Sequence, residues 1–345
     1  MNKMDNTEET KISKYENTIA RSVSNLFENI DQEKKRKLHR TPMRINVILD
    51  GGAFNGSYSL GTLYYLKNLE KHHHISVKRL SGCSVGAFLC VLYLLDDLKY
   101  GFHYYKEIRN CFHKHNDLSA CVKVVEDILE KITLWEKTHK QSFYLFCKER
   151  LYITYFELPT CSQQLSCVFE SNSHLCELLL RSCHIPLIVN NKWSRNSYVD
   201  GFFPYLFNED GHVPNTSSSE KNLFVNLFSY NTYRMLYIRG EENNIQRVMT
   251  GVLETHAFFN SGKCFHNCVT NHLCSYVENW NVFQKQFFHM RKCITYILIH
   301  CVYFMENVST YFHDSTTDAT FKKKYKLLTR YLRKWYKMFV SRWLV

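Results

Sequence analysis

The apolar residues of this chain alternate between short strand-like runs and longer helical patterns. Residues 44–50 and 75–80 are short runs of the strand type, and each leads directly into a glycine-containing turn. Each turn is followed by apolar positions at helical spacing, over residues 60–69 and 88–95. Because strand, turn and helix recur in this order, the pattern predicts a parallel sheet with helices packed on it, an α/β fold.

Later segments follow the same two patterns. Further strands are expected at residues 151–156, 166–169, 198–201 and 223–228, and helices over 103–150 and 175–183. Beyond about residue 245 the pattern is helical to the end of the chain. We therefore expect three parts, namely a mobile N-terminal arm at 1–41 with one short helix, an α/β domain at 42–240 and a mainly helical region at 241–345.

The formal net charge of +12 is concentrated at one end of the chain. Residues 321–345 contain six Lys, three Arg and no Asp or Glu, so nine of the twelve excess charges lie there. The rest of the chain carries only +3, which does not indicate a general nucleic-acid-binding surface. The charge therefore points to a local docking element.

This basic segment also has an apolar face. Apolar residues recur at spacings of three or four, namely Phe321, Tyr325, Leu328, Leu332, Trp335, Phe339 and Trp343. The arrangement predicts a basic amphipathic helix that lies on an anionic membrane surface. One alternative is a helix packed on the body with a solvated basic face. Nucleic-acid binding is the third interpretation, but no nucleic-acid-reading module surrounds these residues, so no nucleic-acid partner is expected.

The N-terminal residues and the cysteines indicate the cellular compartment. The first residues are polar and mixed in charge, without the basic and then apolar order of a secretory signal. Many of the 14 cysteines lie in apolar stretches, which is typical of buried reduced thiols. The apolar run at 293–305 has 13 residues, whereas a bilayer-spanning helix needs about 20. We expect a cytoplasmic protein that associates peripherally with membranes.

The turn after the second predicted strand carries the first candidate for chemistry. Gly82, Ser84 and Gly86 form the pattern GxSxG between a strand and an apolar helix, which is typical of a nucleophile elbow. The glycines permit a strained turn that presents the serine hydroxyl at the positive end of the following helix. The alternative is a purely structural connection, because short glycine patterns also occur by chance.

The turn after the first predicted strand suits the same chemistry. Residues 50–56, Asp-Gly-Gly-Ala-Phe-Asn-Gly, also join a strand to a helix, and their backbone N–H groups can converge on an anion. Beside a nucleophilic serine, that anion is the oxyanion of a tetrahedral acyl intermediate. The alternative is a nucleotide-binding glycine loop, although no Lys with Ser or Thr follows Gly56.

A serine nucleophile needs a base that accepts its proton. In the ordinary α/β-hydrolase arrangement the base is a His near the chain end, and no His of this chain lies in a convincing turn at a strand end. A carboxylate lies in such a turn, because Asp200 and Gly201 follow the predicted strand at Tyr198. Asp200 is therefore the candidate base, and a general α/β-hydrolase with a His base is kept as an alternative.

Taken together, these motifs resemble those of the patatin-like phospholipases. The resemblance rests on DGGxxxG at 50–56, GxSxG at 82–86, a helix ending in SxxIP at 182–186, and D-G at 200–201. These motifs follow the family's order over about residues 44–230.

The resemblance implies a three-layer α/β/α fold with a mainly helical C-terminal region and a catalytic Ser–Asp dyad. Ser84 would be the nucleophile and Asp200 the base, without a metal or cofactor. The oxyanion hole would be formed by the N–H groups of Gly51, Gly52 and Ala53, and the turns by Gly56, Gly82, Gly86 and Gly201. The expected activity is hydrolysis of carboxylic esters of phospholipids or acylglycerols at a membrane surface.

Three positions depart from the family pattern. The family usually has Gly where Ala53 stands, Lys or Arg where Asn55 stands, and Gly or Ala where Phe202 stands. Ala53 is a mild change unless its backbone needs a positive φ. The loss of a basic residue at position 55 removes a positive charge near the oxyanion. A catalytically weak or inactive lipid-binding protein of the same fold is therefore the main alternative.

Two clusters in the sequence contain residue types that can bind a metal ion. His72-His73-His74 is a polar connection before a strand, and three adjacent residues cannot all face one ion. A denser cluster comprises Cys264, His266, Cys268, His272 and Cys274, of which only three would share one helical face. A cysteine-rich packed helix is the expected structure there, with a zinc site as the alternative.

Overall fold

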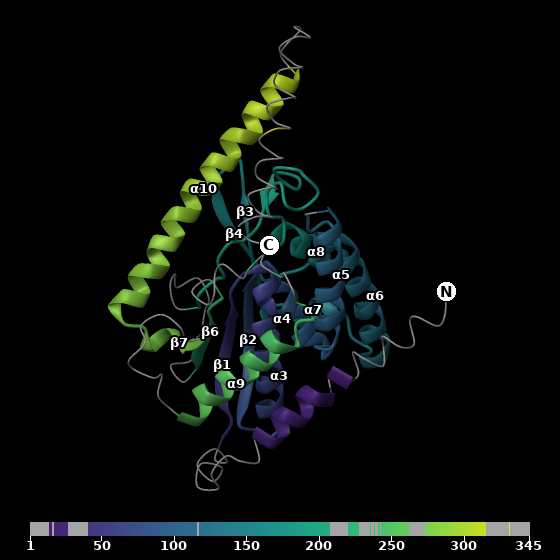
Figure 1. Cartoon of the computed structure of the whole chain (residues 1–345), viewed down its shortest axis with the longest axis vertical. Helices are drawn as coiled ribbons and strands as arrows, with labels where there is room; N and C mark the ends of the chain where they lie inside the picture. Colours follow the sequence, from purple (N-terminus) through teal and green to yellow (C-terminus); the bar gives the residue numbers. More distant parts are fainter. Residues whose placement is uncertain are drawn as a thin grey trace.

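The computed structural model describes most of the chain from residue 41 onward. The described residues are 14, 15, 17–26, 41–115, 117–207, 220–227, 235, 238, 241, 243–261, 273–314 and 331. They form a mixed α/β fold around a mainly parallel central sheet (Figure 1). This confirms the α/β class predicted from the alternation of strands and helices.

The sheet of the described residues has the strand order β4-β3-β2-β1-β6-β7, and β5 pairs with β3. The strands are β1 (Met43–Leu49), β2 (Ile75–Cys83), β3 (Leu151–Glu157), β4 (Ser162–Ser166), β5 (Tyr198–Val199), β6 (Lys221–Val225) and β7 (Cys274–Tyr276). β1 is parallel to both β2 and β6, and β2 is parallel to β3. Because β1 and β2 are adjacent and parallel, the turns that follow them meet at one edge of the sheet.

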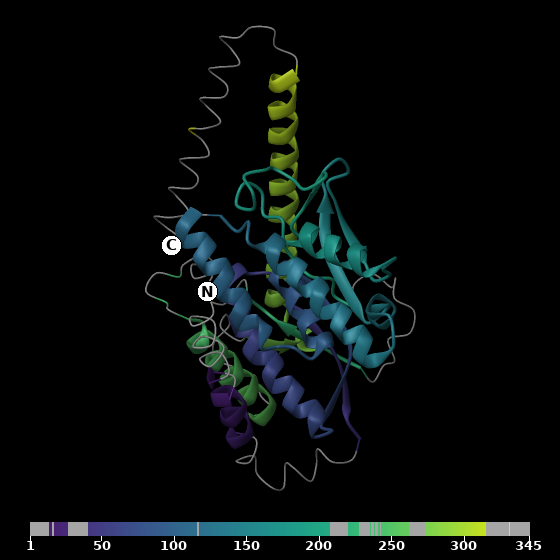
Figure 2. The same ribbon diagram turned by 90° about the vertical axis from the view of Figure 1, so that its right-hand side faces the viewer.

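Helices cover one face of this sheet. They are α3 (Gly56–Lys71), α4 (Val85–Leu95), α5 (Tyr100–His115), α6 (Cys121–His139), α7 (Phe143–Cys147), α8 (Asn172–Ser182) and α9 (Ile245–Ser261). The long helix α10 (Val282–Asp314) lies on the other side of the sheet from α5 and α6 (Figure 2). Alternate residues of β1 therefore enter different cores, since Val47 and Leu49 pack with the helices and Ile48 packs with Phe288 and Ile299 of α10.

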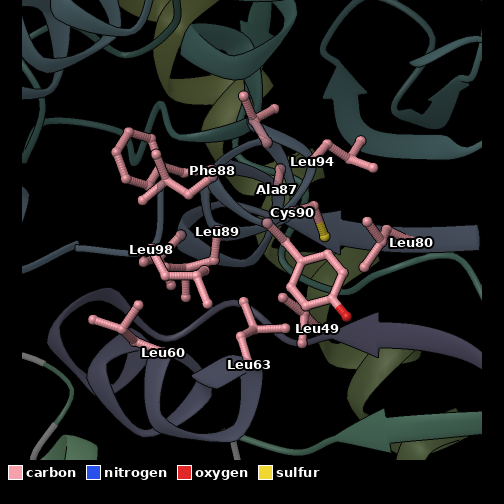
Figure 3. Close-up of a cluster of buried hydrophobic side chains, with 14 of the residues drawn as sticks. Leu49, Leu60, Leu63, Leu80, Ala87, Phe88, Leu89, Cys90, Leu94 and Leu98 are labelled. Atoms are coloured by element: carbon pink, nitrogen blue, oxygen red, sulfur yellow. The ribbon is translucent and has the colours of Figure 1, made fainter. Parts of the chain in front are cut away.

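Helix α4 is buried along its whole length. All eleven of its residues are buried, because it lies between the sheet and the outer helices. In Figure 3 its side chains lie beside Leu60 and Leu63 of α3 and the strand residues Leu49 and Leu80, all in one core cluster. This position explains why residues 85–95 are almost entirely apolar, and it fixes the serine that precedes the helix deep in the molecule.

The structure differs from the sequence expectations in three places. The strand expected at 166–169 lies instead at Ser162–Ser166, antiparallel to β3. Within the range expected to be a mobile arm with one short helix, residues 17–26 are helical as expected, but their buried Ile19 and Val23 pack on the core. Beyond the expected boundary near 240, α9 packs on α3, and the region contains the strand β7 as well as helices.

Three further expectations concern the ends of the chain and the membrane. Within residues 321–345 only Tyr331 is among the described residues, so the basic amphipathic helix expected there lies outside them. The apolar run at 293–305 lies within α10. No helix of the described residues is long and apolar enough to cross a bilayer.

Candidate active site

Ser84 lies at a strained turn between β2 and α4. Its backbone has φ 53° and ψ −132°, a conformation that non-glycine residues rarely adopt and that is typical of functional turns. The turn is tightly packed, because a Cβ at Gly86 would lie 2.5 Å from the carbonyl oxygen of Leu49, and a Cβ at Gly82 would lie 2.5 Å from the amide nitrogen of Ala87. The sequence GxSxG therefore forms the elbow geometry that its spacing predicts.

The loop at 50–53 lies directly against this elbow. A Cβ at Gly51 would be only 3.3 Å from the Cβ of Ser84. The Gly51 N–H donates to the carboxylate of Asp50 at 2.9 Å. The N–H groups of Gly52 and Ala53 donate to no group of the described residues. Of the three expected oxyanion donors, these two are available to a ligand in this conformation.

Ala53 and Phe202 both have left-handed backbone conformations. The φ angle is 45° at Ala53 and 52° at Phe202. The patatin-like motifs that the sequence resembles usually have a small residue at both positions, and a side chain at positive φ costs about 1 kcal/mol. Alanine would be a mild change from glycine at an ordinary backbone conformation. Because the φ angle of Ala53 is positive, this residue instead stores strain beside the elbow.

Asp200 lies on a turn held by the SxxIP segment. Its N–H donates to the carbonyl of His184 at 2.9 Å, and the Gly201 N–H donates to the carbonyl of Ser182 at 3.4 Å. A Cβ at Gly201 would lie 2.3 Å from the carbonyl oxygen of Thr154, so the turn sits tightly against β3. The last turn of α8 thus fixes the position of the candidate base.

The buried hydroxyl of Ser182 connects this turn to the elbow. It accepts the Ser84 N–H at 2.9 Å and donates to the carbonyl of Thr154 at 2.7 Å. One serine of the SxxIP segment therefore hydrogen-bonds both the backbone of Ser84 and the neighbouring strand β3. This explains physically why the segment accompanies the two glycine turns.

Ser84 and Asp200 are brought together in the interior. Ser84 is 6% exposed and Asp200 is 4% exposed. Oδ1 of Asp200 accepts the Phe202 N–H at 2.8 Å, and Oδ2 has no partner of ordinary hydrogen-bond geometry among the described residues. Burial raises the pKa of Asp200 to about 6, and the nearby Ser84 hydroxyl and the Phe202 N–H oppose this rise. A carboxylate with a raised pKa beside a hydroxyl is suited to accept its proton.

Histidines do not take this place in the described structure. His184 is buried, and burial lowers the pKa of its ring to about 4. Neither of its ring nitrogens has a hydrogen-bond partner among the described residues. Among the residues that the structure describes, no histidine ring hydrogen-bonds with Ser84 or Asp200.

Two buried arginines contact the glycine loop, and sequence reasoning missed both. Arg291 of α10 forms two hydrogen bonds with the carboxylate of Asp50, at 2.7 and 2.8 Å. Arg247 of α9 donates to Oδ1 of Asn55 at 2.8 Å and pairs with Glu241. Arg291 shares a helix face with the buried Phe288, Thr295 and Ile299. A lone arginine on an otherwise mostly apolar helix face is the sequence feature from which its burial could have been predicted.

A small apolar cavity adjoins the loop and the elbow helix. It is lined mainly by apolar side chains, including Phe54, Leu60, Val85, Leu89 and Tyr104. Its volume of about 10 Å³ leaves room for no more than one water molecule. Neither Ser84 nor Asp200 lines this cavity, which has no room for a larger ligand in this conformation.

No cluster of three or more His, Cys, Asp or Glu side chains in the described residues is arranged to hold a metal ion. Of the cysteine and histidine cluster at 264–274, only Cys274 is described, so the zinc alternative lies outside the described residues. Comparison with models of known protein families finds no match, and no curated protein matches the chain.

Proposed function

We propose that this protein is a lipid acyl hydrolase with a patatin-like fold and a Ser84–Asp200 dyad. The observation that carries the proposal is the strained, buried Ser84 beside a buried carboxylate whose pKa is raised to about 6. The adjacent N–H groups of Gly52 and Ala53 support the same chemistry. The substrates are carboxylic esters of phospholipids or acylglycerols, the class implied by the resemblance to patatin-like phospholipases.

In the acylation step, Oγ of Ser84 attacks the ester carbonyl carbon and its proton passes to Asp200. The N–H groups of Gly52 and Ala53 hydrogen-bond the resulting oxyanion. When the tetrahedral intermediate collapses, the C–O bond to the alcohol breaks and Asp200 returns the proton to the leaving oxygen. Asp200 then takes a proton from water, which attacks the acyl-enzyme. When this second intermediate collapses, the acyl C–Oγ bond breaks, the fatty acid leaves, and Asp200 returns the proton to Oγ of Ser84.

A covalent labelling experiment tests the dyad. A fluorophosphonate probe should label the wild-type protein at Ser84, as identified by peptide mass spectrometry, because the probe phosphonylates activated serines. Ser84→Ala should abolish labelling, whereas Ser166→Ala at the sheet edge should leave it intact. A protein that binds liposomes without being labelled would instead be the inactive lipid-binding protein.

Helix α10 supports contact with a lipid surface. Large apolar side chains on one of its faces are exposed, namely Phe283, Phe287, Met290, Ile294, Ile297 and Phe304, with Phe283 exposed by 69%. No acidic residue occurs between residues 282 and 305. An apolar helix face without acidic residues is suited to lie at the headgroup boundary of an anionic membrane, and the basic segment 321–345 follows this helix in the sequence.

Truncation at residue 320 should weaken binding to anionic liposomes by at least about 100-fold, because nine basic residues are lost and each adds about 1 kcal/mol near such a surface. Ile294→Glu with Ile297→Glu should also weaken flotation with vesicles. Hydrolysis of a soluble short-chain ester should survive both changes. His289→Glu is the matched control, because this exposed position of α10 lies three or four residues from none of these apolar side chains. Unchanged flotation of the truncated protein would refute a membrane role for this segment.

A further inference from the structure

We propose that Arg291 is a positioning residue of this active site, whose guanidinium joins the loop bearing the oxyanion donors to the turn bearing the base. The inference rests on the proposed function and assigns a role to a residue outside all four motifs. Arg291 belongs to α10, on the opposite side of the sheet from α5 and α6. It lies 241 residues from Asp50 in the chain.

On the side of the glycine loop, Arg291 binds a carboxylate that organises the backbone. Nη1 donates to Oδ2 of Asp50 and Nη2 donates to Oδ1, the paired geometry in which arginine binds carboxylates best. The same carboxylate accepts the N–H of Gly51 at 2.9 Å and that of Leu227 at 3.3 Å. The position of the guanidinium therefore sets the start of the loop that carries Gly52 and Ala53.

On the side of the base, the same guanidinium reaches the turn after β5. Nη2 of Arg291 donates to the carbonyl oxygen of Phe202. The N–H of Phe202 in turn donates to Oδ1 of Asp200. One side chain thus touches the loop that carries the oxyanion donors and the residue that holds the base. Its loss would let the two turns shift relative to each other.

The ion pair of Arg291 and Asp50 also influences the pKa of Asp200. Asp50 is fully buried and Arg291 is 6% exposed, so neither charge is strongly screened by water. Positive Arg291 lowers the pKa of Asp200 and negative Asp50 raises it. The other titratable groups that interact with Asp200 are Ser84 at the elbow, Cys83 of β2, Tyr104 of α5, Cys121 of α6 and Cys183 after α8. Arg291 is the only cation among these groups in the described structure.

A purely structural ion pair would not require these charges. Buried ion pairs can often be replaced by apolar residues of similar volume without loss of stability, whereas removal of one partner alone is strongly destabilising. The two roles can therefore be separated by comparing single variants with the neutral double variant. A positioning role predicts changes in the pH dependence of catalysis that track charge, and a structural role predicts changes in stability alone.

The experiment measures kcat/KM against pH with a soluble short-chain ester, together with thermal unfolding. The wild-type profile should fall below about pH 6, because Asp200 must be ionised to accept a proton. Arg291→Met should move this acid limb up by about one pH unit, and Asp50→Asn should move it down. The double variant Arg291→Met with Asp50→Asn should have its acid limb near the wild-type position. Its kcat should stay low, because no guanidinium connects the two turns.

Two further variants keep the test decisive. Arg291→Lys retains the charge without the paired geometry, so it should lower kcat at least about 10-fold while leaving the acid limb in place. If Arg291→Met fails to fold, the limb of Asp50→Asn and the kcat of Arg291→Lys decide the outcome. Arg247→Lys alters the other buried arginine at the loop, and it should lose thermal stability without moving the limb.

Contrary results are distinguishable from a failure of the proposed function. An active wild-type protein whose single variants keep the acid limb in place, and whose Arg291→Lys retains full kcat, would overturn the role of Arg291 alone. A wild-type protein that neither hydrolyses the ester nor reacts with the fluorophosphonate would overturn the dyad as well.

Discussion

Asp200→Asn should abolish ester hydrolysis and at the same time stabilise the folded protein. If Asp200 is the base of the proposed dyad, the amide cannot accept a proton from Ser84, so kcat/KM should fall by about 10⁴-fold, the loss seen when a triad member of a serine protease is replaced. The Phe202 N–H keeps its acceptor, because Oδ1 of asparagine occupies the same position. The turn should therefore retain its conformation.

The gain in stability follows from the raised pKa. Burial raises the pKa of Asp200 from 3.8 to about 6, so the folded state resists ionisation that the unfolded state permits. Below pH 3.8 both states hold the proton and there is no cost. As the pH rises through 3.8 toward 6 the unfolded state ionises first, and above 6 the folded protein is less stable by about 3 kcal/mol. Asp200→Asn removes this cost only at the higher pH.

Urea denaturation at pH 8 and at pH 4 measures this difference. Asp200→Asn should be more stable than wild type at pH 8 and nearly equal to it at pH 4. Asp96→Asn is the matched control, because the side chain of Asp96 is 80% exposed and should give no such pattern. A variant that hydrolyses esters like wild type, or that is destabilised at pH 8, would show that Asp200 is not a buried catalytic base.

Gly61→Ala should destabilise the protein by about 3 kcal/mol or more. A Cβ at Gly61 would lie 1.9 Å from the carbonyl oxygen of Val248, and a Cβ at Gly251 would lie 2.0 Å from that of Tyr58. Helices α3 and α9 therefore touch backbone to backbone, and a methyl group between them forces the helices apart. Since α3 also packs on the elbow helix α4, the strain would spread into the core.

Gly101→Ala provides the matched comparison. A Cβ there would meet only the end of the Leu60 side chain, at 2.6 Å, and that side chain can rotate away. Urea denaturation at neutral pH should therefore show a much smaller loss for Gly101→Ala than for Gly61→Ala. Equal losses would mean that α9 does not pack on α3 in this way.

The residues that sequence analysis located best are those whose signal is local. A glycine turn needs specific residues within a few positions, so the elbow at Ser84 and the turn at Asp200 were recognisable from spacing alone. The strands β1 and β3 were found because they are short, apolar and β-branched or aromatic. Strand β4 was misplaced because its sequence, SQQLS, is mostly polar, as an edge strand can be.

Long-range pairs left no such local signal. Asp50 and Arg291 meet only because α10 packs on the sheet near the glycine turns. The residues around either one do not predict that the two side chains form a pair. Likewise, α10 extends from Val282 to Asp314, well past the apolar run at 293–305, because polar residues on its exposed faces interrupt the run without ending the helix. The place of α9 in the core depends on close contact between Gly61 and Val248, which lie far apart in the chain.

Helix α10 carries Arg291 on its buried face and its exposed apolar residues on another. A helix is a stiff rod with a rise of about 1.5 Å per residue, so Arg291 and Asp314 lie about 35 Å apart along its axis. Any tilt imposed on the outer end of this rod is transmitted mechanically to the guanidinium, without a hinge between them. The outer end of α10 is thereby joined, through one continuous helix, to the side chain that contacts the Asp50 loop and the Phe202 turn.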